Sequence, residues 1–376
     1  MKIPLIKPNF DKKEEKAVID VLRSGWVTQG PKVEEFERMV ASYVGARYAV
    51  AVTSATTGLF LALHVKGIGA GDEVIVPSFS FIATANVVVH SQAKPIFVDI
   101  DPNTFNIDPE KIEKAISSRT KAIIPVDQVG LPSDLDKIHK IAKAHNLIVI
   151  EDAACAIGTK YKGRKIGSIS EMTVFSFHPR KTITTGDGGM ITTNDKKLAD
   201  RLKLLRNQGM GVSDVKRHSS KKVVQEQYPE IGFNFRMTDI QAAIGIEQMK
   251  KIDRILTKRE KLAKRYDKAF LSSKNIIPPY IPKGYEHNRQ SYVVRVKKES
   301  KISRDNLMQK LLDLGIATRR GVMASHLEKP YVKMLGKIKL PITEEATANT
   351  MVLPLFPKMT ISEQDFVIKN ILNLTQ

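Results

Sequence analysis

The chain has 376 residues, of which 42% are hydrophobic, and a formal net charge of +20. This length predicts two or three domains with a well-buried core, and the mean hydropathy of −0.20 is typical of an ordinary globular protein. No apolar run approaches the roughly 20 residues of a membrane span. The segment MKIPLIKPNFDKKEE becomes charged before a signal sequence develops, so we expect a cytoplasmic protein with no membrane partner.

The basic residues do not form the pattern of a nucleic-acid-binding protein. Lys and Arg number 60 against 40 Asp and Glu, an excess that favours anionic partners. They are scattered as pairs such as Lys12–Lys13 and Arg319–Arg320, with no stripe of interleaved aromatic residues. We therefore interpret them as a solvated surface and expect no nucleic-acid partner. The single cysteine, Cys155, cannot form an intramolecular disulfide, which agrees with a reducing compartment.

In chain order, the region from residue 46 to 194 alternates short apolar runs with helical stretches. Such runs are typical of strands buried on both faces of a parallel sheet that helices cover. The run GMITT (189–193) follows the turn TTGDGG too closely for a helical crossover, so we expect its strand to be antiparallel to its neighbour. The other predicted strands are YAVAV (48–52), EVIVP (73–77), PIFVD (95–99), AIIPV (122–126), LIVIE (147–151) and TVFSF (173–177).

Polar residues follow two of these strands, at the end where open α/β sheets bind ligands. Asp152 follows LIVIE, Ser176 lies near the end of TVFSF, and Lys181 comes shortly after it, so we expect the three to share a site. A carboxylate and an amine placed this way are what pyridoxal 5′-phosphate requires. The amine condenses with the cofactor aldehyde, and the carboxylate keeps the ring nitrogen protonated. Alone, Asp152 would also fit a helix N-cap and Lys181 a solvated loop.

The sequence also offers a binding site for the cofactor phosphate. In TSATTGLFLAL (53–63), a helix is predicted to begin at Ala55 and Thr56, directly after the first strand. Helix N-termini bind phosphate through free backbone N–H groups. The site would thus combine an amine, a carboxylate and an anion-binding helix, which indicates a pyridoxal phosphate enzyme. No metal site is predicted.

The C-terminal part differs in composition and predicts a second, smaller α/β domain. The segment 234–256 predicts one long helix, and SYVVRV (291–296) predicts a strand. We place a large cofactor-binding domain, including the N-terminal segment, at residues 1–250 and the small domain at residues 251–376. The polar segment 211–229 predicts a long loop, which fits either an active-site lid or a surface insertion.

Several segments between residues 3 and 370 are similar, in order, to the DegT/DnrJ/EryC1 family of nucleotide-sugar aminotransferases. They are LRSGWVTQGPKVEEFE, EVIVPSFSFIATANVV, PIFVDIDPNTFNID, VIEDAACAIG, FSFHPRKTITTGDGGMITTND, GFNFRMTDIQAAIG and LPLFPKMT. The resemblance implies the type I aminotransferase fold. That fold is α/β, with a mixed, mostly parallel seven-stranded sheet between helices in the large domain and a smaller C-terminal α/β domain. It also implies an enzyme that uses pyridoxal 5′-phosphate.

The resemblance assigns roles that the residues alone leave open. Lys181 is implied to hold the cofactor and then to carry the proton between cofactor and substrate, while Asp152 pairs with the ring nitrogen. The other implied cofactor-binding residues are Ala55, Thr56 and Ser176 at the phosphate, Phe81 against the ring, Cys155 where the family usually has Gln or His, and Asn234, which would reach the phosphate from a partner subunit. We therefore expect a homodimer with shared active sites.

The resemblance also narrows the substrate. HPRKTITTGDGG (178–189) is similar to members that transfer the amine to C4 of the sugar, and GIATRRGVMASHLEKPY (315–331) is expected to line the sugar pocket. We expect an amino group to pass from an amino acid, L-glutamate, to a nucleoside-diphosphate 4-keto-deoxy sugar. The residues expected to contact this substrate are Trp26, His178, Arg319 and His326.

Two alternatives remain open. One is a C3 aminotransferase that acts on a 3-keto sugar. The other, more remote, is a non-catalytic regulatory or binding protein on the same scaffold, although such a protein need not keep Lys181. A dehydratase branch of the family has histidine in place of the lysine, so the presence of Lys181 also argues against that branch.

Overall fold

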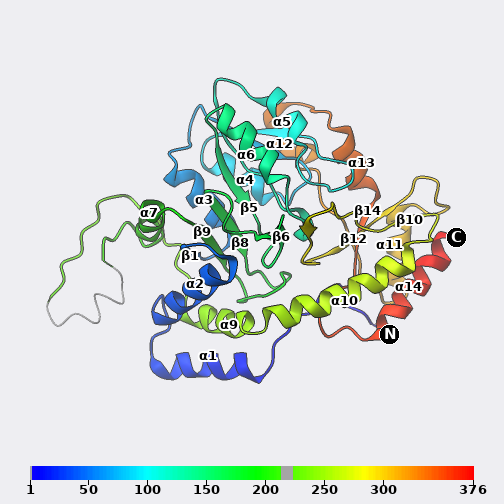
Figure 1. Ribbon diagram of the computed structural model, residues 1–376, viewed down its shortest axis with the longest axis horizontal. Coiled ribbons are helices and arrows are strands. Elements are labelled where there is room, and N and C mark those ends of the chain that lie inside the picture. Colours follow the sequence, from blue (N-terminus) through cyan, green and yellow to red (C-terminus); the bar gives the residue numbers. More distant parts are fainter. Residues whose placement is uncertain (1, 213–222) are drawn as a thin grey trace.

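A computed structural model describes residues 2–212 and 223–376. Within these residues the largest sheet has seven strands and confirms the predicted α/β fold (Figure 1). Part of the predicted loop at 211–229 lies outside the described residues, and its role stays a prediction. Across the sheet the strands are β1 (Tyr48–Val52), β9 (Gly189–Thr193), β8 (Met172–Ser176), β5 (Ile148–Asp152), β4 (Thr120–Ile123), β2 (Glu73–Pro77) and β3 (Lys94–Val98).

The sheet is mostly parallel, and the carboxyl ends of β5 and β8 lie next to each other. β5 pairs in parallel with β4 on one side and with β8 on the other. β9 runs antiparallel to both β8 and β1, as predicted, because too few residues separate it from β8 for a crossover. β4 ends at Ile123, short of the predicted run, and Pro125 then accepts from the Asp152 N–H at 2.9 Å. This bond fixes the end of β5 against the chain that leaves β4.

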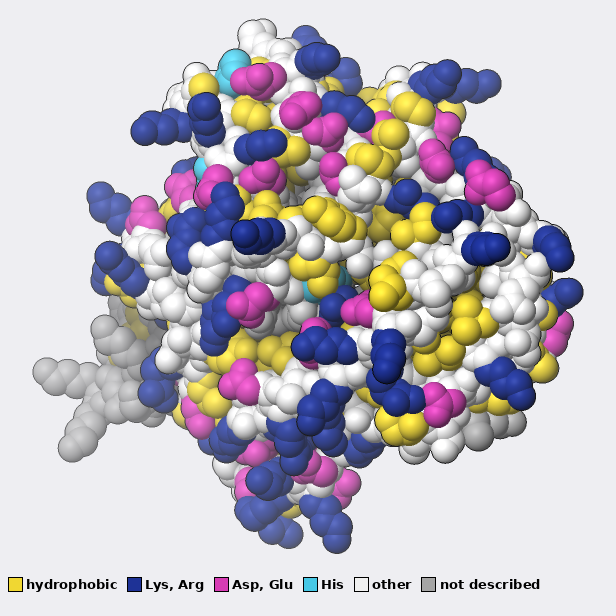
Figure 2. All heavy atoms as spheres, turned by 45° about the vertical axis from the view of Figure 1, so that its right-hand side comes forward, with side chains coloured by type: hydrophobic (Ala, Val, Ile, Leu, Met, Phe, Trp, Pro, Cys, Tyr) yellow, Lys and Arg dark blue, Asp and Glu magenta, His cyan; other side chains and the backbone are white. Residues whose placement is uncertain are grey.

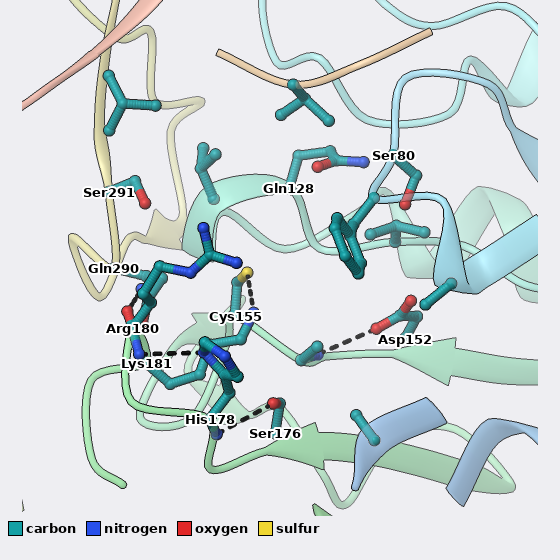
Figure 3. A pocket seen from close by; sticks show the side chains of 18 of the residues that line it. Ser80, Gln128, Asp152, Cys155, Ser176, His178, Arg180, Lys181, Gln290 and Ser291 are labelled. Atoms are coloured by element: carbon teal, nitrogen blue, oxygen red, sulfur yellow. Dashed lines mark hydrogen bonds between the residues drawn. The ribbon is translucent and has the colours of Figure 1, made fainter. Parts of the chain in front are cut away.

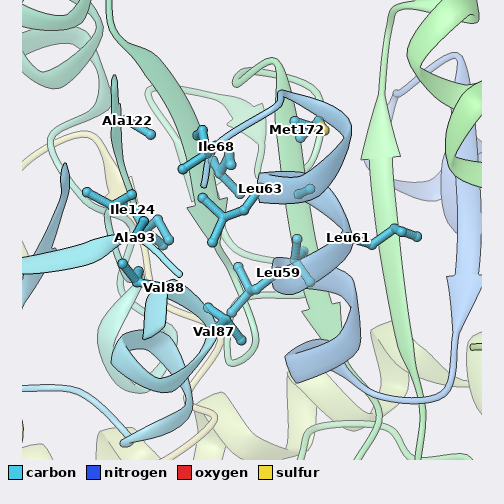
Figure 4. Close-up of a cluster of buried hydrophobic side chains, with 14 of the residues drawn as sticks. Leu59, Leu61, Leu63, Ile68, Val87, Val88, Ala93, Ala122, Ile124 and Met172 are labelled. Carbon is cyan, nitrogen blue, oxygen red and sulfur yellow. The ribbon is translucent and has the colours of Figure 1, made fainter. Parts of the chain in front are cut away.

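Helices cover both faces of this sheet, because its strands are apolar on both sides. On one face α3, α4 and α7 pack in a cluster where Leu59, Leu63 and Val88 meet strand residues such as Met172 (Figure 4). On the other face lie α2, α5, α6 and α9. The helices up to residue 250 are α1 (Lys12–Ser24), α2 (Pro31–Val44), α3 (Ala55–Val65), α4 (Ala83–His90), α5 (Pro109–Ala115), α6 (Leu135–Ala144), α7 (Lys196–Arg206) and α9 (Asp239–Met249).

The chain after residue 250 adds an antiparallel sheet, in the strand order β10-β12-β14-β13. Its core includes Tyr292 and Val367, and also Ile3, which pairs with Ile316. The domain division at residue 250 stays a prediction. The elements are α10 (Ile252–Phe270), β10 (Ile276–Ile277), β12 (Tyr292–Val296), α11 (Arg304–Asp313), β13 (Arg319–Arg320), α12 (Lys329–Leu335), α13 (Pro341–Asn349), β14 (Thr350–Leu353) and α14 (Ile361–Thr375), and a small separate sheet holds β11 (Tyr285–Glu286), β6 (Lys160–Tyr161) and β7 (Arg164–Lys165).

The prediction of one long helix over residues 234–256 is wrong, because two helices, α9 and α10, share this segment. α9 begins late because Thr238 caps it: the Thr238 hydroxyl accepts from the Gln241 N–H at 3.2 Å. The break between the helices falls at Lys251, whose backbone has φ −120° and ψ 10°. The Lys251 ammonium is buried in an ion pair with Glu14, a partner far away in sequence that hydrophobic periodicity does not reveal.

The charged side chains are spread over the surface. On the face drawn in Figure 2, Lys and Arg side chains lie in all parts of the outline, with Asp and Glu between them. Many form exposed ion pairs, such as Arg265 with Asp365 at 2.6 Å. This distribution agrees with the interpretation of the basic residues as a solvated surface. In the described part of the chain, no helix combines the length and the apolar character of a membrane span.

Candidate active site

Most of the predicted site residues meet in a cavity of about 440 Å³ at the carboxyl ends of β5 and β8 (Figure 3). Asp152, Ser176 and Lys181 all line it, as their positions after these strands predicted. The first turn of α3, with Ala55 and Thr56, forms a further part of the wall. One cavity therefore holds an amine, a carboxylate, a hydroxyl group and a helix N-terminus.

Asp152 is the last residue of β5, and its carboxyl group is buried. The Thr84 hydroxyl donates to Asp152 Oδ2 at 2.8 Å, and the Ala154 N–H donates to Oδ1 at 3.2 Å. Burial raises the pKa of Asp152, while these hydrogen bonds and the positive charge of Lys181 act in the opposite direction. A cationic ring nitrogen beside this carboxyl group would favour its ionised form in the same way.

Lys181 lies in the loop between β8 and β9. Its backbone N–H donates to the His178 carbonyl at 2.8 Å, which closes a turn and aims the side chain into the cavity (Figure 3). The Lys181 ammonium donates to Cys155 Sγ at 3.1 Å. Because a thiol is a weak acceptor, this contact holds the amine loosely. Cys155 is thus half-buried on the cavity wall, next to the predicted catalytic residue.

The N-terminus of α3 is arranged to bind an anion. Ser54 caps the helix by accepting from the Thr57 N–H at 3.1 Å, and the Gly58 N–H bonds within the helix, to the Ser54 carbonyl at 3.0 Å. The N–H groups of Ala55 and Thr56, in the first turn, have no acceptor within the helix. They therefore face the cavity as donors for a phosphate.

The surroundings of this turn fit pyridoxal phosphate. Ser176 Oγ accepts from the His178 N–H at 3.3 Å, so its own hydrogen is left to donate to a ligand. Gly189 lets β9 approach the turn closely: a Cβ there would lie 2.5 Å from the Ser54 oxygen and 2.6 Å from the Ala55 nitrogen. Any larger residue would push the turn out of place. The donors for a phosphate and the acceptor for a ring nitrogen thus lie in one cavity.

The rest of the cavity wall combines one predicted residue, Phe81, with residues that were not predicted from the sequence. Phe81, which was predicted, is 54% exposed, so its ring is available to stack on a flat ligand. Gln128 donates to the Phe79 carbonyl, and Gln290 donates to the Arg180 carbonyl at 2.6 Å. These two hydrogen bonds fix the backbone at Phe79 and at Arg180. Arg180 lies beside Lys181 in sequence, and this position could have revealed it.

Two of the four residues predicted to contact the substrate line the cavity. They are His178 and Arg319, and they lie there with Arg180 and Arg320. Burial lowers the pKa of His178, and the nearby charge of Arg180 acts in the same direction, so the ring stays neutral at neutral pH. Three arginines thus line the cavity, together with the acidic residues Asp152 and Asp187. In the part of the chain that the structure describes, no group of three or more His, Cys, Asp and Glu side chains is arranged to bind a metal ion.

Three predicted residues do not line this cavity. His326 is only 1% exposed, and its ring bonds to Ser78 behind the cavity wall. The Trp26 indole donates to the Gln29 carbonyl at 3.2 Å, near the start of α2. Asn234 is exposed on the surface of its own chain, which is where a residue that acts in a partner subunit would lie. The roles predicted for these residues stay predictions.

The chain is similar over nearly its whole length to other proteins. Residues 8–372 match the DegT/DnrJ/EryC1/StrS aminotransferase family. The chain is 42% identical to the uncharacterized protein MJ1066 of Methanocaldococcus jannaschii, over 95% of this chain and 94% of that protein. It is 40% identical to the spore coat polysaccharide biosynthesis protein SpsC of Bacillus subtilis, over 100% of this chain and 97% of that protein.

The fold also matches that of a solved structure. Spr1654 of Streptococcus pneumoniae, which is assigned as a sugar aminotransferase, superposes in its PMP-form with a TM-score of 0.93 at 31% identity, over 100% of this chain and 99% of that chain. The PLP-form of the same protein gives a TM-score of 0.92. The chain therefore belongs to the DegT/DnrJ/EryC1/StrS aminotransferase family and is a nucleotide-sugar aminotransferase whose cofactor is pyridoxal 5′-phosphate.

Proposed function

We propose that the chain transfers an amino group from L-glutamate to C4 of a nucleoside-diphosphate 4-keto-deoxy sugar. The observation that carries the proposal is that Lys181, Asp152 and the N-terminus of α3 meet in one cavity. These groups supply what the cofactor needs. Arg180, Arg319 and Arg320, which line the same cavity, would supply what a diphosphate, or the carboxylates of glutamate, needs.

The chain would hold the cofactor at both ends. The Asp152 carboxylate would pair with the ring nitrogen, and Phe81 would lie against the ring. The residues assigned to the phosphate are Ala55 and Thr56, through their N–H groups, and Ser176, through its hydroxyl. When bound, pyridoxal phosphate supplies a ring that stabilises the negative charge left on a carbon after its proton is removed. Cys155 would lie near the ring hydroxyl, where it would be a weaker hydrogen-bonding group than Gln or His.

Lys181 would move the proton in both half-reactions. As a free amine, Lys181 Nζ would take the proton from the α-carbon of glutamate and return it on the cofactor side. In the second half-reaction it would act in the opposite sense and deliver a proton to C4 of the sugar. A loosely held amine suits this role, and the contact of Lys181 Nζ with the Cys155 thiol meets that condition.

The choice of C4 depends on the similarity of residues 178–189 to members that transfer the amine to this position. The name of SpsC refers to spore coat polysaccharide biosynthesis, which supports an amino sugar destined for a surface glycan. NMR of the product would be expected to place the new nitrogen on C4. Nitrogen on C3 would replace this proposal with an aminotransferase for 3-keto sugars.

We also propose that the enzyme acts in the cytoplasm as a homodimer. Asn234 of the partner subunit would then reach the phosphate-binding end of each cavity. The exposure of Asn234 on its own chain supports this assignment.

The absorption spectrum of the purified protein with pyridoxal phosphate, before and after addition of L-glutamate, tests the proposal. We expect the band of lysine-bound cofactor to be replaced by that of the pyridoxamine form. Lys181→Ala should lack the first band and reduce turnover by about a thousandfold or more. Lys162→Ala is the control, because Lys162 is exposed and pairs with Asp136 at the surface.

Two spectral results would overturn different parts of the proposal. A lysine-bound band that glutamate does not change would overturn the choice of donor. A wild-type protein without any such band would overturn the catalytic proposal and favour the binding-protein alternative.

A further inference from the structure

Two segments far apart in sequence lie side by side behind the cavity wall. The first, residues 78–84, leaves β2 and carries Phe81; the second, residues 319–326, begins with β13. Phe79 and Ala324 form an antiparallel bridge, and the Ser325 N–H donates to the Ser78 carbonyl at 2.8 Å. The backbones of the two segments are therefore already in register where the side chain of His326 joins them.

His326 makes hydrogen bonds on both sides of its ring. Its Nδ1 lies 2.6 Å from Ser78 Oγ, and its Nε2 lies 3.4 Å from Glu344 Oε1. Because a carboxylate can only accept, Nε2 carries the hydrogen and Nδ1 accepts from the Ser78 hydroxyl. The backbone N–H of His326 also donates to Ser78 Oγ at 3.0 Å, so this oxygen both donates and accepts. Ser78 and the His326 ring are inaccessible to solvent.

The segment that Ser78 begins reaches the cofactor side of the cavity twice. Phe81 lies on the cavity wall, and the Thr84 hydroxyl donates to Asp152 Oδ2 at 2.8 Å. The Ser80 hydroxyl donates in turn to Thr84, also at 2.8 Å, since Thr84 uses its own hydrogen on Asp152. A displacement of this segment would therefore move both the ring-stacking residue and the hydrogen bond that orients Asp152.

The segment that His326 ends reaches the substrate side of the same cavity. Arg319, Arg320, Val322 and Met323 all line it. His326 itself does not, because its ring is turned to Ser78 and Glu344. The His326 ring therefore joins the segment that carries Phe81 to the segment that carries Arg319, although the ring itself does not line the cavity.

We propose that His326 is a positioning residue that fixes the segment 78–84 to the segment 319–326 through Ser78, and thereby holds Phe81 and Asp152 in place for the cofactor. This inference rests on the proposed cofactor roles of Phe81 and Asp152. It gives His326 a different role from the substrate contact predicted from the sequence.

Two substitutions of His326 separate its two hydrogen bonds. The amide of His326→Asn lies where Nδ1 was, so it keeps an acceptor for Ser78 and loses Glu344. The amide of His326→Gln lies where Nε2 was, so it keeps a donor for Glu344 and loses Ser78. We expect His326→Gln to increase deuterium uptake by the peptide that covers residues 78–84 in the cofactor-free protein. It should also raise the dissociation constant for pyridoxal phosphate about tenfold, as the loss of one buried hydrogen bond predicts. His326→Asn should resemble the wild type in both measurements.

Ser78→Ala removes the same contact from the other side and guards against misfolding of the histidine variants. It also removes the bond that Ser78 Oγ accepts from the His326 N–H, so its effect should be at least that of His326→Gln. The double variant Ser78→Ala/His326→Gln should be no worse than Ser78→Ala alone. Tyr331→Phe is the control for lost stability. It removes a partly buried hydrogen bond to Asn86 of α4, at 2.6 Å, without touching Ser78, so it should change neither measurement.

Equal behaviour of His326→Asn and His326→Gln, or wild-type values for His326→Gln, would overturn the positioning role. These outcomes are distinct from a failure of the proposed function. The exchange measurement needs neither cofactor nor substrate, whereas the proposed function fails if the wild-type protein shows no lysine-bound cofactor, no response to L-glutamate, or a product with the new nitrogen on C3.

Discussion

At the scale of single residues, the Thr84 hydroxyl is the side-chain group that orients the Asp152 carboxyl group. Thr84 donates to Asp152 Oδ2 and accepts from Ser80, and all three residues are buried. We predict that Thr84→Val, which removes the hydroxyl at nearly constant volume, weakens pyridoxal phosphate binding by about tenfold or more. The reason is that hydrogen bonds to charged groups contribute about 1.5–3 kcal/mol. Equilibrium titration of the cofactor-free protein measures this change.

Thr84→Ser is the matched control, since it keeps the hydroxyl and removes only a methyl group. Its dissociation constant should stay close to that of the wild type. If Thr84→Val bound the cofactor as tightly as Thr84→Ser, Asp152 would have to keep its orientation through the Ala154 N–H alone.

The same residues show which parts of the site a sequence can reveal. Asp152, Ser176 and Lys181 could be predicted together because each follows a strand, and strand patterns are local. The bond from Thr84 to Asp152 joins residues 68 positions apart, and the bond from Ser78 to His326 joins residues 248 positions apart. Such contacts depend on how the segments pack, so no local pattern contains them. His326, which was predicted to contact the substrate, is buried and does not line the cavity, and no local pattern could show this placement.

At the scale of elements, β5 carries different chemistry on its two faces. Asp152 lines the cavity, whereas the Glu151 carboxyl group is buried on the other face against that of Asp127. The Thr173 hydroxyl donates to Glu151 Oε2 and the Ser133 N–H donates to Asp127 Oδ1, each at 2.8 Å. Among the described residues, the other two oxygens, Oε1 and Oδ2, have no separate donor. The two carboxyl groups satisfy each other when one of them keeps a proton and donates it to the other.

This shared proton predicts that stability falls as the pH rises. Burial raises the pKa of both carboxyl groups, and the charge of Glu151 raises that of Asp127 further. Above the ordinary pKa of a glutamate, 4.5, and up to the raised pKa, the folded protein binds more protons than the unfolded chain. The free energy of unfolding therefore falls by up to about 1.4 kcal/mol per pH unit for each extra proton. The contribution is complete below this window and is lost as the pH passes the raised pKa.

We predict that Glu151→Gln flattens this decline. The amide oxygen can still accept from Thr173, and the amide N–H₂ can donate to Asp127 without a shared proton. Urea unfolding at about pH 5 and about pH 8 gives the free energies to compare. Glu299→Gln, at an exposed carboxyl group, is the control and should keep the wild-type slope. Parallel declines in Glu151→Gln and the wild type would show that the pair does not hold the proton.

Elements differed in how well the sequence predicted them. β1, β2 and β9 match their predicted runs because a buried strand is apolar throughout and ends at a turn. The break between α9 and α10 was missed because it falls at Lys251, whose ammonium pairs with Glu14 on α1, far away in sequence. Hydrophobic periodicity predicts which face of a helix is buried. It does not predict ion pairs with residues far away in sequence.

At the scale of the whole molecule, the proposed homodimer depends on the surface around Asn234. Asn234 is exposed, and its backbone forms an antiparallel β-bridge with Asn207. In the same segment Ile231 is 91% exposed and Tyr228 is 61% exposed, so large apolar side chains lie open on this face. A second copy of the chain would cover them and would bring Asn234 of the partner subunit to the phosphate-binding end of the cavity.

We predict that the variants Lys181→Ala and Asn234→Ala complement each other in mixed dimers. Asn234→Ala alone should keep the dimer and weaken pyridoxal phosphate binding by about tenfold, as the loss of one hydrogen bond to a phosphate predicts. In a mixed dimer with shared sites, one cavity receives its lysine from one variant and its asparagine from the other, so it is complete, while the other cavity carries both defects. At a cofactor concentration that fills only complete sites, neither variant alone should form the pyridoxamine band with L-glutamate.

Co-expression of the two variants with different purification tags isolates the mixed dimers, and these should form that band. Mixed dimers that stay inactive would show that each cavity takes all its residues from one chain. The exposed Asn234 would then have no part in the site. Recovery would show that the catalytic lysine and the phosphate-binding asparagine act across the interface, so that the site exists only in the dimer.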